Sequence, residues 1–346
     1  MHSSINACFT LTAVKSSVSN LTHRIPSQDR GSVTAVTTLG DDVFVLRYDR
    51  EQVEVYDAVT FTLQRHITVR GLGSESQAFG MIACARNKCL YISYAIEEEA
   101  SVEQLSDSDS NAVEQASGGN AVLVEHGYIV KVELPGGNAM KKWEVKTDSK
   151  TDSKNRGVGL TGLSVNIAGN LVVACCAANV VQEYGTDGDR KKEIPVTRPW
   201  HAIQLSTGNY AVCHSTPIGE VSVVVPDGQV IHSCKHSDVG PMRYPTGLAV
   251  TMNDDIIVAD EDNFRVLSIT FKRSTDDIQE GRPTDRVGGT STVHVKQLAL
   301  LVGEGDGCHL PIAVCLDESR DRLYVGEWNG QDRVLVFDRF TAISGL

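Results

Sequence analysis

The stretch YPTGLAVTMNDDIIVADEDNFRVLSI, residues 244–269, decides the fold. It contains three short apolar runs, which are PTGLAV from Pro245, IIVAD from Ile256 and RVLSI from Arg265. Polar turn residues separate these runs. Short apolar runs bounded by Asn, Asp and Gly are typical of β-strands joined by tight turns. The stretch therefore predicts three consecutive strands.

The same pattern recurs six times along the 346 residues. The first strands of the six units read GSVTAV, AFGMIA, LTGLSV, PWHAIQL, PTGLAV and PIAVCL, and they start at residues 31, 78, 160, 199, 245 and 311. Two of the intervals between the starts of successive units are longer than the others. Each of these two intervals contains an insertion, at about 96–127 and about 272–292. A period of ~40–50 residues with several short strands per unit is the signature of propeller blades.

Closure of the ring depends on the two ends of the repeat. The first five units each contain a fourth candidate strand, whereas the sixth stops without one. Residues 7–14, ACFTLTAV, precede the first unit and could supply the missing strand. We therefore predict an all-β, six-bladed propeller of four-stranded antiparallel blades, closed by an N-terminal strand and forming a single domain over residues 1–346.

Composition narrows the classes of protein. The net charge of −12 and the 41% apolar content indicate a soluble globular chain, and no stretch has the ~18 apolar residues of a membrane span. The N-terminus lacks the pattern of a secretory signal, so we expect a cytoplasmic monomer that does not bind membranes. The insertion at 96–127 is acidic and Ser-rich, which predicts disorder. The nine cysteines show no disulfide or zinc spacing.

The fifth and sixth units resemble NHL repeats. Residues 244–269 and LPIAVCLDESRDRLYVGEWNGQDRVLVF, residues 310–337, follow the pattern Pro-x-Gly-apolar-Ala-Val, then apolar-Val-Ala-Asp, then Asn-x-Arg-apolar. Six such blades resemble the C-terminal propeller of tripartite-motif NHL proteins, although the RING, B-box and coiled coil of that family do not occur in this chain. The resemblance therefore implies a propeller without implying ubiquitin-ligase activity for this chain, which is either a fragment or a stand-alone propeller.

Paired charges in these two units have a structural interpretation. Asp260 ends one strand and Arg265 begins the next, with Asn263 between them, and Glu327 and Arg333 repeat the arrangement. A carboxylate and a guanidinium so placed can form charge-assisted hydrogen bonds across the turn. We therefore expect structural pairs, and the alternative is that Asp260 and Glu327 are metal ligands.

One face of the propeller should collect the functional residues. The second strands end on it, and their last residues form a predicted ring of Arg47, Tyr94, Cys175, His214, Asp260 and Glu327. Loops between blades add Arg198, Trp200, His201, Met242, Arg243, Tyr244, Cys308 and His309, and Trp328 follows Glu327. Aromatic residues and arginine dominate protein-binding hot spots. We select as binding residues Arg47, Tyr94, Trp200, His201, His214, Arg243, Tyr244 and Trp328.

The function predicted from these residues is a non-enzymatic scaffold that binds a protein or peptide on this face, with no metal and no cofactor. The first alternative is a metal-dependent hydrolase or lactonase on the same fold. Separately, His201, His214 and His309 could meet over the channel as a zinc site of the kind that a related six-bladed lyase family uses. The ring mixes a cation, a phenol, a thiol, an imidazole and two acids, which disfavours a dedicated metal site. RNA binding is the third candidate, and it is disfavoured by the acidic charge and the scarcity of Lys/Arg clusters.

Overall fold

The computed structural model describes residues 21–25, 31–48, 50–70, 72, 76–99, 123–137, 140–146, 159–214, 219–237, 240–272, 294–328 and 333–340. Blade one contains β2 (Val33–Leu39), β3 (Asp42–Arg47), β4 (Gln52–Asp57) and β5 (Leu63–Thr68), and blade two contains β6 (Ser76–Cys84), β7 (Cys89–Glu99), β8 (Leu123–Glu133) and β9 (Met140–Glu144). Blade three contains β10 (Leu160–Val165), β11 (Leu171–Cys175), β12 (Val180–Tyr184) and β13 (Arg190–Pro195).

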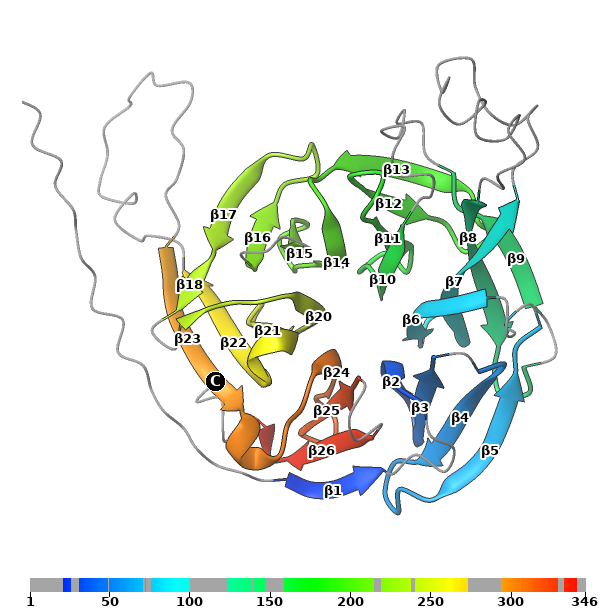
Figure 1. The fold of residues 1–346 in the computed structure, drawn as a ribbon, viewed down its shortest axis with the longest axis horizontal. Helices are drawn as coiled ribbons and strands as arrows, with labels where there is room; N and C mark the ends of the chain where they lie inside the picture. The colour runs from blue at the N-terminus through cyan, green and yellow to red at the C-terminus, as the bar shows by residue number, and fades with distance from the viewer. Residues whose placement is uncertain are drawn as a thin grey trace, which may run out of the picture.

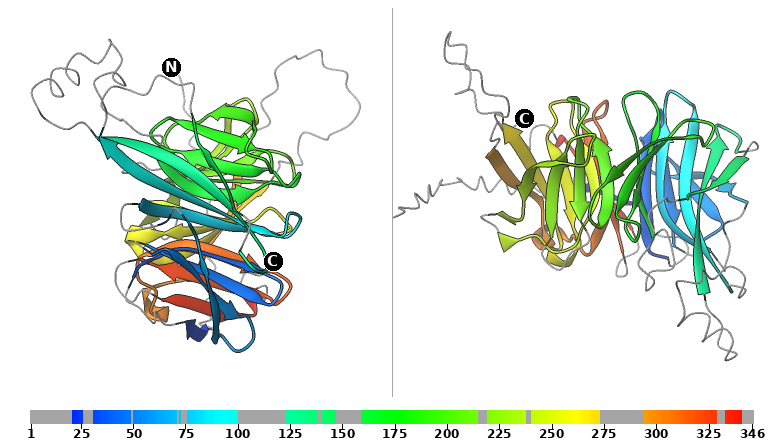
Figure 2. Two further views of the ribbon diagram at one scale, coloured as in Figure 1. Left: turned by 90° about the vertical axis from the view of Figure 1, so that its right-hand side faces the viewer. Right: turned by 90° about the horizontal axis from the view of Figure 1, so that it is seen from above.

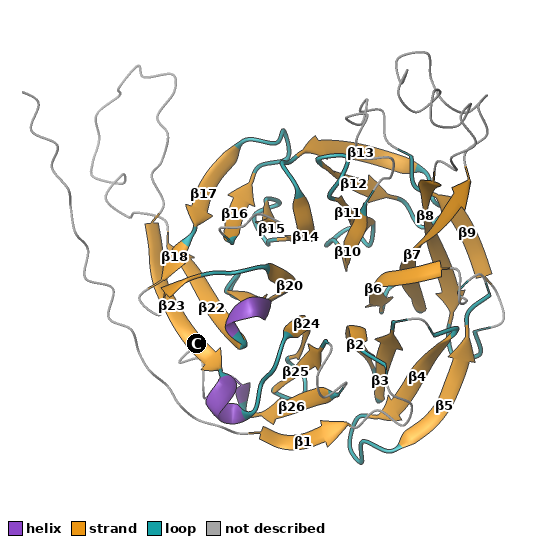
Figure 3. Ribbon diagram, viewed as in Figure 1, coloured by secondary structure: helices purple, strands orange, loops and turns teal. Residues whose placement is uncertain are grey.

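Blade four contains β14 (Pro199–Gln204), β15 (Tyr210–His214), β16 (Glu220–Val224) and β17 (Val230–Cys234), followed by the short pair β18 (His236–Ser237) and β19 (Gly240–Pro241). Blade five contains β20 (Pro245–Val250), β21 (Ile256–Asp260), β22 (Arg265–Lys272) and β23 (His294–Val302), and blade six contains β24 (Pro311–Asp317), β25 (Arg322–Glu327), β26 (Val334–Asp338) and β1 (Leu21–Ile25). Two short 3-10 helices, η2 (Glu261–Asn263) and η4 (Glu304–Asp306), follow β21 and β23 (Figure 3).

These six four-stranded antiparallel sheets stand around a central axis, which confirms the predicted six-bladed propeller (Figure 1). The first strand of each blade lies nearest the axis and the last lies at the rim (Figure 1). Figure 2 shows the blades side by side from two further directions. We call the face at which the innermost strands begin the top face, and the face at which they end the bottom face.

The core lies between the blades. Six clusters of buried apolar side chains form, and each draws its members from two adjacent blades around the closed ring. The middle strands β11, β15 and β21 are therefore buried along their whole length, whereas the outer strand β17 is mostly exposed. Strands covered on both faces need continuous apolar runs. This requirement explains why the second strand of each unit is the clearest signal in the sequence.

An N-terminal strand closes the ring, but it is not the predicted one. β1, residues 21–25, pairs antiparallel with β26, and Ile25 is fully buried against Val334 and Val336 of blade six. The predicted strand 7–14 lies outside the described residues. The prediction chose the most apolar segment, whereas an outer strand buries little, and β1 is joined to β2 by a connection as short as those between other blades.

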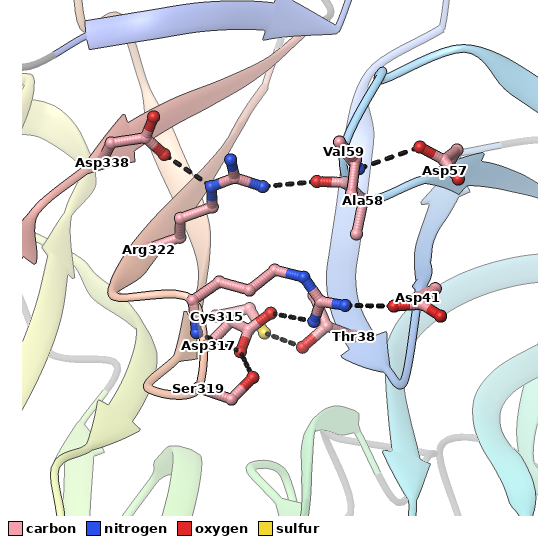
Figure 4. Close-up of polar contacts among 11 residues, drawn as sticks. Thr38, Asp41, Asp57, Ala58, Val59, Cys315, Asp317, Ser319, Arg322 and Asp338 are labelled. Atoms are coloured by element: carbon pink, nitrogen blue, oxygen red, sulfur yellow. Dashed lines mark hydrogen bonds and ion pairs between the residues drawn. The ribbon is translucent and has the colours of Figure 1, made fainter.

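Polar contacts reinforce the seam between blades six and one on the bottom face (Figure 4). The Arg322 guanidinium donates to Asp338 at 2.5 Å and to the carbonyl of Ala58 in blade one. Arg320 bonds Asp317 at 2.9 Å within its own blade and pairs with Asp41 of blade one. The two ends of the ring are thus joined by a strand on the outside and by guanidinium contacts underneath.

Each innermost strand has a register irregularity at the same level. In blade four, Pro199 pairs with His214 and His201 with Cys213, so Trp200 has no cross-strand partner. Equivalent breaks follow the pairs Val33–Arg47, Ala78–Tyr94, Leu160–Cys175, Pro245–Asp260 and Pro311–Glu327. A bulge bends its strand and redirects side chains. The six second-strand residues of the predicted ring are therefore structurally equivalent.

The margins of the two insertions differ from the prediction. Residues 96–99 and 123–127 belong to β7 and β8, which stay paired as far as Glu99 and Leu123. Tyr94 consequently lies inside β7 and does not end it. Residues 100–122 and 273–293 lie outside the described part of the chain. No helix among the described residues is long and apolar enough to cross a membrane.

Candidate functional site at the channel mouth

A cavity of about 560 Å³ lies on the propeller axis. Its wall is built mainly from the innermost strands, whose bulge residues Thr34, Phe79, Thr161, Trp200, Thr246 and Ile312 all line it. Three further lining residues, Tyr48, Glu261 and Trp328, each follow the last residue of a second strand in sequence. They therefore sit at the top end of the cavity, which we call the channel mouth.

Three aromatic side chains, Tyr48, Trp200 and Trp328, line the channel mouth. The rings of Tyr48 and Trp328 meet edge to face with centroids 5.1 Å apart, which joins blades one and six. Trp200 of blade four lines the same cavity and packs on the core between blades four and five. All three side chains are partly exposed. A half-exposed aromatic rim around a cavity is a typical ligand-binding surface.

Glu261 lies between these aromatic residues in ring order, because blade five stands between blades four and six. It opens helix η2, and its backbone N–H donates to the carbonyl of Tyr244 at 3.2 Å. Its carboxylate has no hydrogen bond or ion pair with any residue that the structure describes. Burial, with a smaller effect from Asp262, raises the pKa of Glu261 to about 7. The protein thus holds a carboxyl group that changes charge near neutral pH.

The neighbouring carboxylate, Asp260, is completely buried and fully used by its own blade. It accepts hydrogen bonds from the backbone N–H of Arg243 at 2.6 Å, from Asn263 at 2.8 Å and from the Arg265 guanidinium at 2.6 Å. This contact set fixes η2 and thereby the position of Glu261. The predicted pair of Asp260 and Arg265 is confirmed.

The equivalent pair in blade six is also confirmed. The buried Glu327 carboxylate accepts from Arg333 at 2.8 Å and from the backbone N–H of His309 at 2.8 Å. Burial raises the pKa of Glu327. In blade one the charges are reversed, because the buried Arg47 guanidinium donates to Glu54 at 2.9 Å. Each charged member of the predicted ring therefore bonds within its own blade.

The remaining members of the ring are buried as well. Tyr94 and Cys175 are fully buried, and His214 is nearly so. Both His214 nitrogens have protein contacts, Nδ1 with the carbonyl of Thr197 at 2.7 Å and Nε2 with the hydroxyl of Ser222 at 2.6 Å. Arg47, Tyr94 and His214 are thus not presented on the surface of the top face, and their role in binding stays a prediction.

His201 joins three blades across the channel wall. Its Nδ1 accepts from the backbone N–H of Leu248 in blade five at 3.0 Å, so Nε2 carries the proton and donates to the carbonyl of Leu163 in blade three at 3.0 Å. Burial lowers the pKa of His201 to about 4. The imidazole is therefore neutral at pH 7, with both nitrogens occupied by backbone partners.

The zinc alternative required His201, His214 and His309 to meet. His309 instead contacts the ring of Phe264, with centroids 6.2 Å apart. Among the described residues, no three or more His, Cys, Asp or Glu side chains converge in a group that could hold a metal ion. The eight described cysteines are free thiols, and burial raises the pKa of several, including Cys89 and Cys234, to about 11.

Of the loop residues selected from the sequence, Arg198, Arg243 and Tyr244 are exposed beside the mouth, and Met242 and Cys308 are buried. The sequence analysis selected Trp200, His201 and Trp328, all of which line the cavity, and missed Tyr48 and Glu261. The sequence did contain a pattern that could have identified these two residues. Tyr48, Glu261 and Trp328 occupy the same place in their units, because each directly follows a residue of the predicted ring.

Comparisons with known proteins support the architecture. The NHL repeat family model matches residues 242–267, which is the deciding stretch of blade five. No curated protein sequence matches the chain significantly.

Solved structures show the same fold at low identity. A streptogramin B lyase structure is 9% identical with a TM-score of 0.52, covering 91% of this chain and 96% of the lyase. A catalytically inactive histidine variant of virginiamycin B lyase from Staphylococcus aureus, with quinupristin, is 9% identical with a TM-score of 0.51, covering 92% and 88%. Hydrazine synthase from Kuenenia stuttgartiensis is 13% identical with a TM-score of 0.51, covering 90% and 97%. The chain is thus an all-β, six-bladed propeller with an NHL repeat in its fifth blade.

Proposed function

We propose that this propeller is a non-enzymatic interaction domain that binds a peptide segment of a protein partner across the channel mouth. The observation that carries the proposal is the aromatic rim of Tyr48, Trp200 and Trp328 around an open cavity. Tyr244, 44% exposed, and the exposed Arg243 extend this surface outward. Trp, Tyr and Arg are the residue types enriched at hot spots of protein interfaces. The resemblance to the propellers of tripartite-motif NHL proteins also favours binding.

RNA is a poor fit for the same surface. Nucleic-acid affinity comes mainly from cations that neutralise phosphates. The only charged residue among the described residues that line the cavity is Glu261. A carboxylate at the mouth repels a phosphate backbone and favours a neutral or cationic partner.

Selection of peptides on the full chain tests the proposal. A random peptide library displayed on phage would be selected, and the affinities of enriched peptides measured by fluorescence polarisation for wild type, Trp328→Ala and Met252→Ala. Loss of a hot-spot aromatic should weaken binding by ~2 kcal/mol, which is about 30-fold. Met252 is 77% exposed on the bottom face and serves as the control.

Melting temperature separates lost binding from lost folding in this experiment. Trp328→Ala should melt close to wild type, because Trp328 lies at the rim and is only partly buried. Absence of any selected peptide, or a peptide that tolerates Trp328→Ala but not Met252→Ala, would overturn the proposal.

One observation, the pKa of Glu261, supports the alternative that the protein is an enzyme. Glu261, with a pKa of about 7 in a largely apolar cavity, has the protonation behaviour of a general acid or base. Incubation of the protein with quinupristin, the compound named with one of the lyase structures, would test this activity, with Glu261→Gln as the matched variant. Elemental analysis for calcium and zinc after dialysis would test the metal-dependent form.

A further inference from the structure

The channel mouth is electrostatically asymmetric. Blades four, five, six and one contribute Trp200, Glu261, Trp328 and Tyr48, which makes one continuous arc with the carboxylate flanked by tryptophans. Blades two and three contribute neutral groups such as Gln77 and Thr161 to the opposite arc. Blade two also contributes the aromatic ring of Phe79. A ligand that enters the mouth therefore meets aromatic rings on both sides but the carboxylate on one side only.

Among the residues that the structure describes, no cationic side chain bonds to this carboxylate. Three guanidiniums at the ends of second strands or the starts of third strands are already paired, since Arg47, Arg265 and Arg333 bond to Glu54, Asp260 and Glu327 of their own blades. Arg243 contacts η2 through its backbone, since its carbonyl accepts from the N–H of Asp262. Asp262, which adds to the effect of burial on the pKa of Glu261, is also an acid. A carboxylate removed from water without a partner is costly, so a cationic ligand would relieve that cost.

Resting on the proposed function, we propose that the partner segment is anchored by an arginine or lysine side chain, whose charged head lies at the mouth between Glu261 and the rings of Tyr48, Trp200 and Trp328. The carboxylate provides the opposite charge. The electron-rich faces of tryptophan and tyrosine add cation–π attraction, which grows when the cation is partly removed from water. The apolar wall of the cavity below accommodates the adjoining aliphatic part of the segment.

Isosteric probes test the charge of the anchor directly. N-acetylarginine N-methylamide and its citrulline counterpart have nearly the same shape, but only the first is a cation. Their dissociation constants would be measured at pH 8 by NMR titration against the full chain. We expect the arginine compound to bind at least tenfold more tightly than the citrulline compound.

Two glutamate variants locate the effect. Glu261→Gln should bring the two dissociation constants to within twofold, whereas Glu51→Gln should leave the preference intact. Glu51 is an exposed acid in the turn between β3 and β4, on the same face but outside the cavity, so the two variants change the net charge equally. Both should fold, since the Glu261 side chain bonds no described residue.

The pH profile provides a second readout. Burial holds the pKa of Glu261 near 7, so its carboxylate fraction rises about tenfold from pH 6 to pH 8, and arginine affinity should rise by about the same factor. Among the described residues, the titratable and charged groups nearest to Glu261 in sequence or backbone contact are Asp260, Asp262, Arg243 and Tyr244. His201, Tyr48 and Cys315 line the same cavity. The pKa of His201 is lowered to about 4 and that of Cys315 is raised to about 11, so neither titrates in this range.

The results separate this inference from the proposed function. If arginine and citrulline compounds bind equally, or if Glu261→Gln keeps the preference, the cationic anchor is wrong, even where selected peptides still depend on Trp328. If the arginine compound binds through Glu261 while no peptide binds, the cation site stands and the peptide partner is wrong.

Discussion

The bottom rim and the channel mouth use polar side chains in opposite ways. We define the bottom rim as the turns between the first and second strands of each blade. There, side chains form hydrogen bonds with the backbone of the preceding blade. The Gln204 side chain accepts from the N–H of Ile167 at 3.1 Å. In the same way, Asp254 accepts from the N–H of Ser206 and Glu318 accepts from the N–H of Met252, both at 2.8 Å. At the top, Asp260, Glu327 and Arg47 bond within their own blades.

This difference separates closure of the ring from binding. Contacts between blades satisfy the polar groups of the bottom rim and leave few of them for a ligand. Contacts within blades at the top fix the strand ends rigidly but do not bridge the mouth, which stays lined by aromatic rings and one carboxylate without a described partner. A ligand site needs a rigid frame and unsatisfied groups together, and the top face has both.

The largest expected effect tests the rigid frame at the top. Asp260→Ala should lower the free energy of unfolding by ~3–5 kcal/mol, because it leaves the Arg265 guanidinium in a mostly buried site without its carboxylate. Urea denaturation measures this change. Asp187→Ala, which removes a 78% exposed acid paired with Lys141, should cost less than ~1 kcal/mol. A loss at Asp260 as small as that control would mean that the frame does not depend on this pair.

The next effect tests whether His201 braces the channel wall. His201→Ala should cost ~1–3 kcal/mol, because it leaves the N–H of Leu248 and the carbonyl of Leu163 without their partner. The exposed His66→Ala is the control and should stay within ~0.5 kcal/mol.

The pH dependence of folding stability provides a second test of the role of His201. Its pKa is about 4 in the folded protein and ~6.5 when unfolded, so only the unfolded chain takes up this proton between those values. Wild type should therefore lose stability as the pH falls from about 6.5 to about 4. His201→Ala should lack this part of the loss, and an equal slope in both proteins would refute a buried neutral imidazole.

The next prediction tests whether the channel mouth favours binding over stability. Burial raises the pKa of Glu261 to about 7 in the folded protein, so wild type loses stability as the pH rises from ~4.5 through 7. Glu261→Gln should melt at a higher temperature than wild type at pH 8 and at nearly the same temperature at pH 4.5. Glu51→Gln should melt like wild type at both pH values. A destabilised Glu261→Gln at pH 8 would mean that the carboxylate has a structural partner.

The smallest expected effect concerns the bottom rim. Ser206→Ala removes the hydroxyl contact with Asp254 but keeps the backbone hydrogen bond, at an exposed position. Such surface contacts are worth ~0–1 kcal/mol each, so closure should depend on their number. Denaturation of Ser206→Ala alone and combined with Glu318→Ala would show the sum. If Ser206→Ala alone lowered the free energy of unfolding by more than ~2 kcal/mol, closure of the ring would depend mainly on this one contact and not on the number of contacts.

The sequence was sufficient to predict the blades because their second strands are covered on both sides and so must be apolar. The strands IIVAD and LVVAC are recognisable in the sequence as continuous apolar runs. Because the second strands of all units are equivalent, their last residues, among them Arg47, Tyr94 and Asp260, were placed at one level of the ring. Hydrogen bonds between side chains and the backbone, in contrast, produce no recognisable pattern in the sequence. Nothing in the sequence indicates that His201 bonds the main chain of two other blades, or that Asp260 accepts from the N–H of Arg243.

The closing strand β1 and the cavity residue Glu261 were missed because neither stands out in the sequence. β1, LTHRI, exposes most of its residues and has little apolar signal, so only the short connection to Val33 identifies it. Glu261 stands in a polar turn of the sequence, beside Asp260, Asp262 and Asn263. Its environment depends on Trp200 and Trp328 from the adjacent blades, and ring geometry alone brings these three together.

The pairing of β1 with β26 also has a consequence for biosynthesis. Thr22 and Val336, which share a hydrogen bond, are 314 residues apart. At ~5–20 residues per second, β1 is synthesised roughly 15 to 60 s before its partner strand. Throughout that interval an unpaired strand is exposed to other nascent chains in the cell. LTHRI presents mostly polar side chains and buries only Ile25 completely, so it offers little apolar surface to another chain during this interval. The weak apolar character of β1 therefore lowers the tendency of this strand to associate wrongly before β26 is made.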